Sequence, residues 1–308
     1  MRYADSLSLV RHTPLLHLKR LHDGPQRLFG KLDLFQPGGS VKDRAAAQVI
    51  ADAHATGLLK PGQRVVEMTS GNMGAGLAFI CKQWGNPFTA VMSSGNSPER
   101  KRVMLALGAE VILVNQVDGE PGRVTGTDLQ AAMDFAKNLA EETGAYYVDQ
   151  FNNESGVKAH YRTTGPEIYQ DLPEIDAFVA CVGSGGTFVG TSRYLKEVKP
   201  SVRCIAVEPT NVAILSSGKK LGAVHIIQGT GYGFVPPKWD ASVADAIVTV
   251  SDEDVRNTAL RLSHEQGLYA GYSAGANVFA ALRYMEQHPE LENVATMICD
   301  TGYKYSDL

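Results

Sequence analysis

Gln-Pro-Gly-Gly-Ser-Val-Lys-Asp-Arg-Ala-Ala-Ala, residues 36–47, is the most informative stretch of this sequence. A tight Pro-Gly-Gly turn precedes Lys42, and the alanine-rich run behind it favours a helix. A lysine held between a turn and a helix start moves little, and its amine can be made nucleophilic. A single lysine of this kind is more often an exposed surface residue. A chemical role for Lys42 therefore depends on further motifs.

The composition is that of an ordinary globular enzyme. The 308 residues are enough for two lobes with a substantial core, and 44% hydrophobic with 20% charged residues shows no bias toward disorder. A formal net charge of -4 gives no electrostatic reason to expect nucleic acid or an anionic membrane as a partner. The apolar stretches are short and interrupted by glycine or charge, so none predicts a membrane span.

The cysteines and the first residues bear on compartment and on metals. Cys81, Cys181, Cys204 and Cys299 are widely spaced in apolar runs, without a CxxC or Cys/His ligand pattern. We expect them to be buried and reduced, and we expect no metal site. The first five residues lack the basic and apolar regions of a signal peptide. The sequence therefore predicts a cytoplasmic protein.

Strand-like and helix-like runs alternate along nearly the whole chain, which predicts an α/β fold with largely parallel sheets flanked by helices. Expected strands cover residues 15–18, 28–32, 64–68, 88–92, 110–114, 177–182, 204–207, 246–250 and 296–299. Expected helices cover residues 41–54, 98–107 and 128–142, and a further one passes through 77–81. From the division of the strands into two series, we expect a smaller mobile lobe at 41–145. The larger lobe would consist of 1–40 and 146–308.

A second motif, Thr-Ser-Gly-Asn at residues 69–72, lies at an expected strand-to-helix junction. Backbone N–H groups and small hydroxyls at a helix start form an anion site, here for a carboxylate or a phosphate. The side chain of Asn72 can also donate a hydrogen bond to a phenolic oxygen. The same four residues would equally make a good helix cap, so this motif alone decides little.

A third motif, Gly-Ser-Gly-Gly-Thr at residues 183–187, directly follows an apolar strand. Its glycines let the backbone approach a phosphate closely, and Thr187 adds a hydroxyl at the helix start. It is not a Walker A loop, because no lysine follows the last glycine, and Phe188 in the sixth place departs from GxGxxG. In a fourth segment, residues 271–277, Ser273 would either offer its hydroxyl to a heteroaromatic nitrogen or cap a helix.

In this order, the motifs resemble those of fold-type-II pyridoxal 5'-phosphate (PLP) enzymes of the cysteine synthase (O-acetylserine sulfhydrylase) and cystathionine β-synthase family. The matching segments are residues 38–44, 69–72, 160–168, 183–187, 231–236 and 273–275. They cover essentially the whole chain in the family's order. The resemblance implies a two-lobed, tryptophan synthase β-like fold with PLP as cofactor.

The resemblance also implies roles for individual residues. Lys42 would form the Schiff base with PLP and move the substrate's α-proton, which makes it the catalytic residue. The implied cofactor contacts are Lys42, Asn72 at the phenolic oxygen, Gly183, Ser184, Gly185, Gly186 and Thr187 at the phosphate, and Ser273 at the pyridine nitrogen. The implied substrate contacts are Thr69, Ser70, Gly71, Met73, Gln150 and Tyr232.

Ser273 has a mechanistic consequence. A neutral hydroxyl leaves the pyridine nitrogen largely unprotonated, which weakens carbanion delocalisation and favours rapid loss of a β-substituent. The implied reaction is β-replacement on an O-activated serine through an aminoacrylate intermediate, first of all O-acetylserine plus sulfide to L-cysteine. The family resemblance further implies a homodimer, and for some members binding of serine acetyltransferase.

Three alternatives stay open at this point. One is β-replacement of the cystathionine β-synthase type or a related type, with serine or O-phosphoserine as donor or with homocysteine or an amine as nucleophile. Another is a dehydratase-type lyase, and the third is a PLP-binding protein without catalysis. Two departures from cysteine synthases bear on this choice: Met73 replaces a threonine, and Tyr232 replaces a small residue but matches the cystathionine branch.

Overall fold

The structure, a computed structural model, describes residues 2–122, 124–219, 225–305 and 308. The chain divides into two compact units. Unit 1 consists of Met1–Val10 and Lys42–Gly156, and unit 2 consists of Arg11–Val41 and Val157–Leu308. Each unit has its own sheet and its own hydrophobic core.

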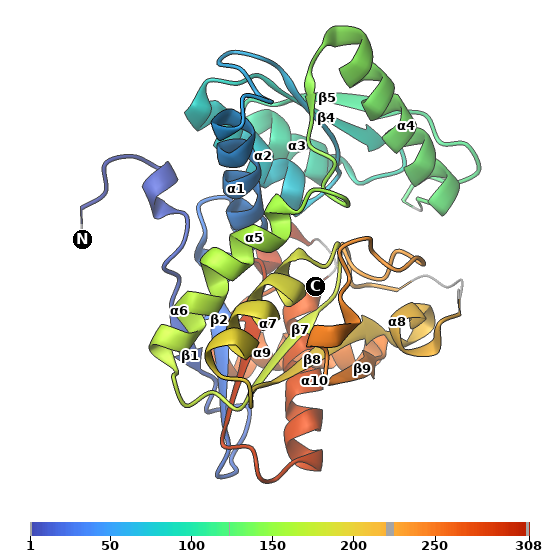
Figure 1. Cartoon of the computed structure of the whole chain (residues 1–308). Helices are drawn as coiled ribbons and strands as arrows, with labels where there is room; N and C mark the ends of the chain where they lie inside the picture. The colour runs from blue at the N-terminus through green and yellow to red at the C-terminus, as the bar shows by residue number, and fades with distance from the viewer. Residues whose placement is uncertain (1, 123, 220–224, 306–307) are drawn as a thin grey trace. The chain divides into compact units, whose positions relative to one another are not determined.

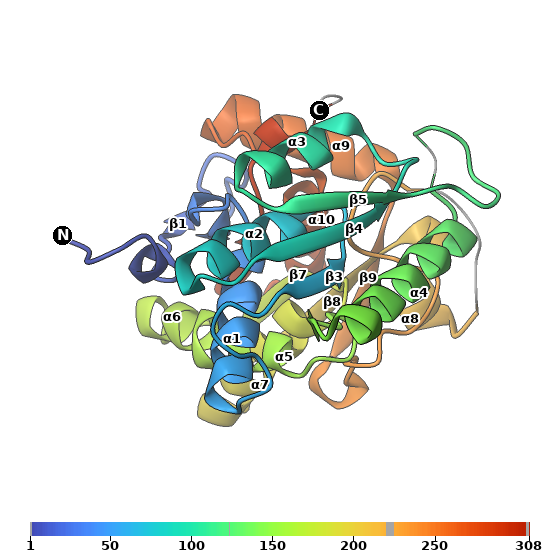
Figure 2. The ribbon, with the colours of Figure 1, turned by 90° about the horizontal axis from the view of Figure 1, so that it is seen from above.

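Unit 1 is built on a four-stranded parallel sheet in the order β5-β4-β3-β6. Figure 2 shows β5, β4 and β3 side by side. The strands are β3 (Val65–Met68), β4 (Phe88–Ser93), β5 (Glu110–Val114) and β6 (Tyr146–Tyr147). The helices are η1 (Leu7–Leu9), α1 (Lys42–Ala55), α2 (Asn72–Trp84), α3 (Pro98–Ala106) and α4 (Gly126–Thr143). Short connections between parallel strands and helices bring the carboxyl ends of β3, β4 and β6 to one edge of the sheet.

Small residues allow the helices of unit 1 to pack closely. On α4, Ala132, Ala136 and Ala140 recur every four residues and are buried, and α4 packs against β3 and β4. Between α1 and α2, a Cβ at Gly76 would lie only 3.2 Å from the carbonyl oxygen of Lys42. Glycine at position 76 therefore permits the close contact between the starts of the two helices.

The boundaries of unit 1 differ from the predicted lobe at 41–145. Leu7 and Val10 pack into the core of unit 1, so the first ten residues group with it instead of with the larger lobe. At the other end, β6 pairs with β3 and Val148 is buried in the same core, which extends the unit to Gly156. The mobility expected for the smaller lobe stays a prediction.

Unit 2 is built on a six-stranded sheet in the order β1-β2-β10-β7-β8-β9. Its strands are β1 (Leu15–His17), β2 (Arg27–Leu32), β7 (Ala177–Cys181), β8 (Arg203–Pro209), β9 (Ala246–Val250) and β10 (Asn293–Ile298). All pairs are parallel except β1 with β2 at the edge, where a short connection requires an antiparallel hairpin. The predicted α/β class with largely parallel sheets is confirmed.

The helices of unit 2 cover its sheet. They are α6 (Thr164–Asp171), α7 (Gly186–Val198), α8 (Ile214–Ser217), α9 (Asp252–Gln266) and α10 (Tyr272–Gln287), with α5 (Ser155–Arg162) beginning just before the unit. Short 3-10 turns are η2 (Asp33–Phe35), η3 (Thr210–Val212), η4 (Ala241–Val243) and η5 (Gly302–Lys304). Figure 1 shows α10 beside the sheet, and it packs against β7, β9 and β10. Along β7, Val179 joins the core that contains α10, whereas Phe178 and Ala180 join the core that contains α7.

Cys81, Cys181 and Cys204 are buried free thiols, as predicted, whereas Cys299 is only half-buried because it follows the end of β10. Within the described ranges, no helix has the length and apolar character that a membrane crossing requires.

Candidate active site

The 69–72 loop of unit 1 joins the carboxyl end of β3 to the start of α2. The Thr69 N–H donates to the Val91 carbonyl at 2.9 Å, so the loop leaves the sheet beside β4. Gly71 is the N-cap of α2 and has no side chain to cap it, so the helix-cap interpretation of this motif is wrong. The first N–H groups of a helix have no intrahelical acceptor, and they attract anions. Gly71 is exposed, and a Cβ there would meet no heavy atom within 4 Å, so the start of α2 is open to its surroundings.

Lys42 and Asn72 are the first residues of α1 and α2, respectively. The Gly76 contact places the carbonyl of Lys42 one helical turn beyond Asn72 on α2. The predicted turn before Lys42 is present: the Gly39 N–H donates to the Gln36 carbonyl at 2.8 Å, and Gly39 has a φ of 72°. The structure thus places the predicted lysine at a helix start, directly after a tight turn.

Gln150 and Met73 occupy different environments in unit 1. Gln150 follows the carboxyl end of β6, whose neighbour in the sheet is β3, so it belongs to the same sheet edge as Thr69. The Met73 side chain is 5% exposed and packs in the core of unit 1. A contact of Met73 with substrate would therefore use its backbone.

The 183–187 loop of unit 2 has a geometry that only glycine fits. A Cβ at Gly183 would lie 2.2 Å from the Gly229 carbonyl oxygen. Gly185, the N-cap of α7, has a φ of 92°, and a Cβ there would meet the Lys238 backbone at 3.3 Å. The loop leads directly into the first turn of α7, whose N–H groups have no intrahelical acceptor. These features fit the phosphate group of PLP.

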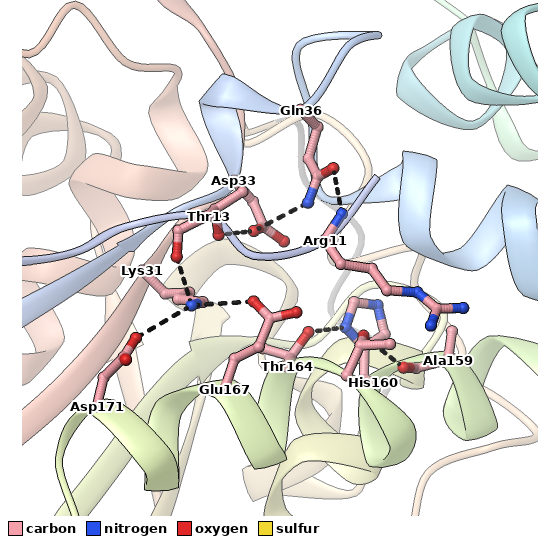
Figure 3. Close-up of polar contacts among 11 residues, drawn as sticks. Arg11, Thr13, Lys31, Asp33, Gln36, Ala159, His160, Thr164, Glu167 and Asp171 are labelled. Carbon is pink, nitrogen blue, oxygen red and sulfur yellow. Dashed lines mark hydrogen bonds and ion pairs between the residues drawn. The ribbon is translucent and has the colours of Figure 1, made fainter. Parts of the chain in front are cut away.

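A buried histidine, His160, supports this loop, and Figure 3 shows its contact with Thr164. Nε2 of His160 lies 3.2 Å from the Thr187 hydroxyl, and Nδ1 lies 2.8 Å from the hydroxyl of Thr164, which begins α6. Gly190 makes this approach of α5 and α7 feasible, because a Cβ there would lie 2.2 Å from the Val157 carbonyl oxygen. The imidazole therefore fixes the position of the Thr187 side chain relative to α5 and α6.

Ser273 is the second residue of α10, close to the carboxyl end of β7. The N-cap of α10 is Gly271, so the alternative in which Ser273 caps the helix is wrong. Asn277, one turn further along α10, accepts a hydrogen bond from the Cys181 N–H at 2.7 Å and donates to the Met297 carbonyl at 2.8 Å. This buried amide ties α10 to β7 and β10, which holds Ser273 near the strand that leads into the 183–187 loop.

Tyr232 lies beside the same glycine loop. Its hydroxyl would be 3.9 Å from a Cβ at Gly229, the residue whose carbonyl touches Gly183. The Tyr232 ring stacks on Phe234 with centroids 5.8 Å apart. The structure therefore brings Tyr232 and the glycine loop together within unit 2.

The predicted residues form two sets. Lys42, Gln150 and the segment 69–73 belong to unit 1, whereas Tyr232, Ser273 and the segment 183–187 belong to unit 2. In the portions of the chain that the structure describes, no group of three His, Cys, Asp or Glu side chains is placed to hold a metal ion.

Sequence reasoning missed two residues beside these segments. It assigned no role to His160, although this residue begins the 160–168 segment that the family resemblance had singled out. It also missed Arg100, whose Nη1 lies 3.1 Å from the Ser70 hydroxyl oxygen. No sequence pattern predicts the contact between Arg100 and Ser70, because the two residues are 30 positions apart and follow neighbouring strands.

Comparison with known proteins places the chain in a family. The family described as pyridoxal-phosphate dependent enzyme matches residues 7–300. The chain belongs to this family, and it is a PLP-dependent enzyme of the two-domain fold-type-II class.

Particular relatives are similar over nearly their whole length. A probable cysteine synthase of Bacillus subtilis is 40% identical over 98% of this chain and 96% of its own. An O-ureido-L-serine synthase of Streptomyces lavendulae is 39% identical over 97% of this chain and 90% of its own. The crystal structure of an O-acetylserine dependent cystathionine β-synthase from Helicobacter pylori has a TM-score of 0.90 at 34% identity, covering 100% of this chain and 98% of that one.

Proposed function

We propose that this enzyme catalyses β-replacement on an O-activated L-serine, with O-acetylserine and sulfide giving L-cysteine as the first-ranked reaction. The observation that carries the proposal is the pairing of an anion-binding helix start at 69–72 with a lysine at the adjacent helix start. The relatives named cysteine synthase support the choice of donor and nucleophile.

In this proposal each segment of unit 1 has one task. Thr69, Ser70 and the N–H groups at the start of α2 bind the α-carboxylate of the amino acid, with Gly71, Met73 and Gln150 lining the same site. Asn72 donates its side-chain amide to the phenolic oxygen of PLP. The Lys42 amine would hold the cofactor covalently until the amine of the substrate takes its place, and the freed Lys42 amine could then take the proton from Cα of the substrate and return one to it.

The residues of unit 2 act on the other ends of the cofactor. Gly183, Ser184, Gly185, Gly186 and Thr187 bind its phosphate, and the Ser273 hydroxyl faces its ring nitrogen. Bound PLP supplies the electron sink that makes the α-proton acidic. Because Ser273 carries no charge, it does not stabilise a protonated ring, which favours expulsion of a β-substituent over long-lived carbanion chemistry.

Product analysis of the purified holoenzyme tests the proposal. The enzyme is incubated with O-acetyl-L-serine and either sulfide, L-homocysteine or no nucleophile, and the products are identified by mass spectrometry. We expect L-cysteine with sulfide, and none from Lys42→Ala under the same conditions. Absence of L-cysteine from an enzyme that has bound PLP would reject the first-ranked reaction.

Tyr232 favours a second candidate, β-replacement with a larger nucleophile. Its phenol beside Gly229 and its stack on Phe234 give the 231–236 segment a bulky, polar surface. Cystathionine formed from homocysteine faster than cysteine from sulfide would support this candidate. Pyruvate released without any nucleophile would instead indicate a dehydratase-type lyase, and bound PLP without any turnover a non-catalytic protein.

We further propose that the enzyme is a cytoplasmic homodimer, as the family resemblance implies. Light scattering after size-exclusion chromatography measures the mass of the assembly against the 33.2 kDa of one chain. Binding of the C-terminal peptide of a serine acetyltransferase is an additional proposal, and a fluorescence titration of the holoenzyme with that peptide tests it.

A further inference from the structure

Arg100 on α3 contacts the segment proposed to bind the substrate carboxylate. Its Nη1 lies 3.1 Å from Oγ of Ser70, which is in the loop between β3 and α2. Both residues belong to unit 1, and both are half-buried. The contact joins the segment that follows β4 to the loop that follows β3, at the edge of the sheet where neighbouring parallel strands end.

The chemistry of the two groups determines the direction of this hydrogen bond. A guanidinium has only donors, so Arg100 donates and the Ser70 oxygen accepts. Among the residues that the structure describes, the Ser70 hydroxyl makes no other hydrogen bond. Since a hydroxyl has a single proton, the proton of Ser70 is left to donate elsewhere. An anion bound at the start of α2 would lie next to Ser70, and an anion requires hydrogen-bond donors.

Asn96 holds the guanidinium in place. Its Oδ1 accepts from the same Nη1 at 3.2 Å, while its Nδ2 donates to the Ser93 carbonyl at 3.0 Å. The second contact assigns the amide oxygen to the side of Arg100, because a carbonyl can only accept. Ser93 is the last residue of β4, so the guanidinium is anchored to the sheet through one side chain.

We propose that Arg100 is a positioning residue for the carboxylate of the substrate. Its guanidinium cannot accept a hydrogen bond, and it donates one to a lone pair of Ser70 Oγ. The proton of the Ser70 hydroxyl is thereby directed to the substrate carboxylate. The positive charge of Arg100 also favours an anion at the 69–72 loop. This inference rests on the proposed function, because it takes an amino acid as the ligand of the loop. A purely structural role, in which Arg100 only links two loops, is the competing explanation.

Ligand binding to the PLP-loaded enzyme separates the two explanations without requiring turnover. The enzyme is titrated with L-serine, L-cysteine and L-serinamide, and the visible absorbance of the bound cofactor reports binding. L-serinamide keeps the amine and the hydroxyl but has no carboxylate. For Arg100→Met we expect binding of L-serine and L-cysteine to weaken about tenfold to a hundredfold, as for loss of a hydrogen bond to a charged group. Binding of L-serinamide should change less than about twofold, within the scatter of a neutral contact.

Two variants complete the test. Arg102→Met removes the same charge from an exposed position of α3 and should leave all three affinities unchanged. Arg100→Lys keeps a donor and a charge and should restore most of the affinity for L-serine. Equal weakening of carboxylate and amide ligands in Arg100→Met would overturn the proposal in favour of a structural role. So would failure of the wild-type enzyme to bind either amino acid. Binding that behaves as expected without L-cysteine synthesis would reject only the proposed reaction.

Discussion

The Lys31 ammonium lies 3.0 Å from the Glu167 carboxylate, and the two side chains are only 1% and 9% exposed (Figure 3). Nζ of Lys31 also donates to the Thr13 carbonyl at 2.5 Å and lies 3.6 Å from Asp171. This ion pair ties β2 to α6 within unit 2, and the first residue of α6, Thr164, contacts His160.

Removing the lysine should be strongly destabilising. Lys31→Met removes the Lys31 charge from beside the buried carboxylate of Glu167, and removing one partner of a buried ion pair typically costs about 3–5 kcal/mol. We expect a lower denaturant midpoint for unfolding of this variant, measured by circular dichroism in urea. The double variant Lys31→Met/Glu167→Gln removes the Glu167 charge as well and should recover a large part of the loss.

An exposed ion pair provides the control. Arg27 and Glu174 are 3.8 Å apart and about half exposed, so Arg27→Met should change stability by no more than about 1 kcal/mol. If Lys31→Met were as mild as Arg27→Met, the buried pair would contribute no more than a surface pair.

The sequence predicted most strands well, because parallel strands that are buried on both faces have continuous apolar runs. It also predicted the turn before Lys42 and the loops at 69–72 and 183–187, because each contains glycine. It missed the pairing of residues 146–147 with β3, since two residues are too few for a strand pattern. It also assigned the first ten residues to the wrong unit. Leu7 and Val10 carry no local signal that tells which core they join.

The candidate site was predictable only as far as local sequence determines it. At positions 183 and 185 a Cβ would come too close to neighbouring backbone atoms, so both positions require glycine. A requirement of this kind appears in the sequence as a glycine motif. The Arg100–Ser70 and His160–Thr187 contacts arise when elements distant in sequence pack together, and one sequence does not encode them as a pattern.

Gly183→Ala should disrupt cofactor binding. The new Cβ would lie 2.2 Å from the Gly229 carbonyl oxygen, so the loop or the 229–232 turn must move away. Because the 183–187 loop is the proposed phosphate site, we expect much weaker retention of PLP. The visible absorbance of the purified enzyme, titrated with added PLP, measures this effect.

Gly126→Ala is the matched control for glycine replacement. Gly126 is the first residue of α4, and a Cβ there would meet no heavy atom within 4 Å. The variant should retain PLP normally and should be as stable as the wild type or slightly more so, because alanine favours helix formation. Retention of PLP by Gly183→Ala to the same degree would argue against a phosphate site at residues 183–187.

His160→Leu should weaken PLP binding by releasing the Thr187 hydroxyl. The variant removes the ring nitrogens that lie 3.2 Å from Thr187 and 2.8 Å from Thr164. Loss of one hydrogen bond is worth about 1 kcal/mol, so the PLP dissociation constant should rise about fivefold. Thr187→Val should act similarly, and the double variant should show less than the product of the two effects, because both act through one contact.

Thr163→Val distinguishes this effect from general damage to the helix junction. The Thr163 hydroxyl donates to the Ala159 carbonyl at 2.7 Å and, within the described part of the chain, makes no hydrogen bond to Thr187. Its loss should therefore lower the melting temperature without changing the affinity for PLP. Multiplicative effects of His160→Leu and Thr187→Val would show that the two side chains act independently.

Asp128 should give unit 1 a stability that depends on pH. Backbone hydrogen bonds from Thr125 at 3.0 Å and Val117 at 2.6 Å, together with the Gln116 side chain, hold the pKa of this carboxyl well below its ordinary value. A lowered pKa in the folded state stabilises the fold above the unfolded pKa of about 3.9, and this stabilisation is lost as the pH falls through the folded value.

Asp128→Asn should therefore have a lower melting temperature than the wild type at neutral pH. The difference in melting temperature between the wild type and the variant should stay constant from about pH 7 to 5 and become smaller below about pH 4. Thermal melts across this range measure the difference, with exposed Glu141→Gln on the same helix as the control. A difference that remained unchanged down to about pH 3 would mean that the charge of Asp128 does not stabilise the start of α4.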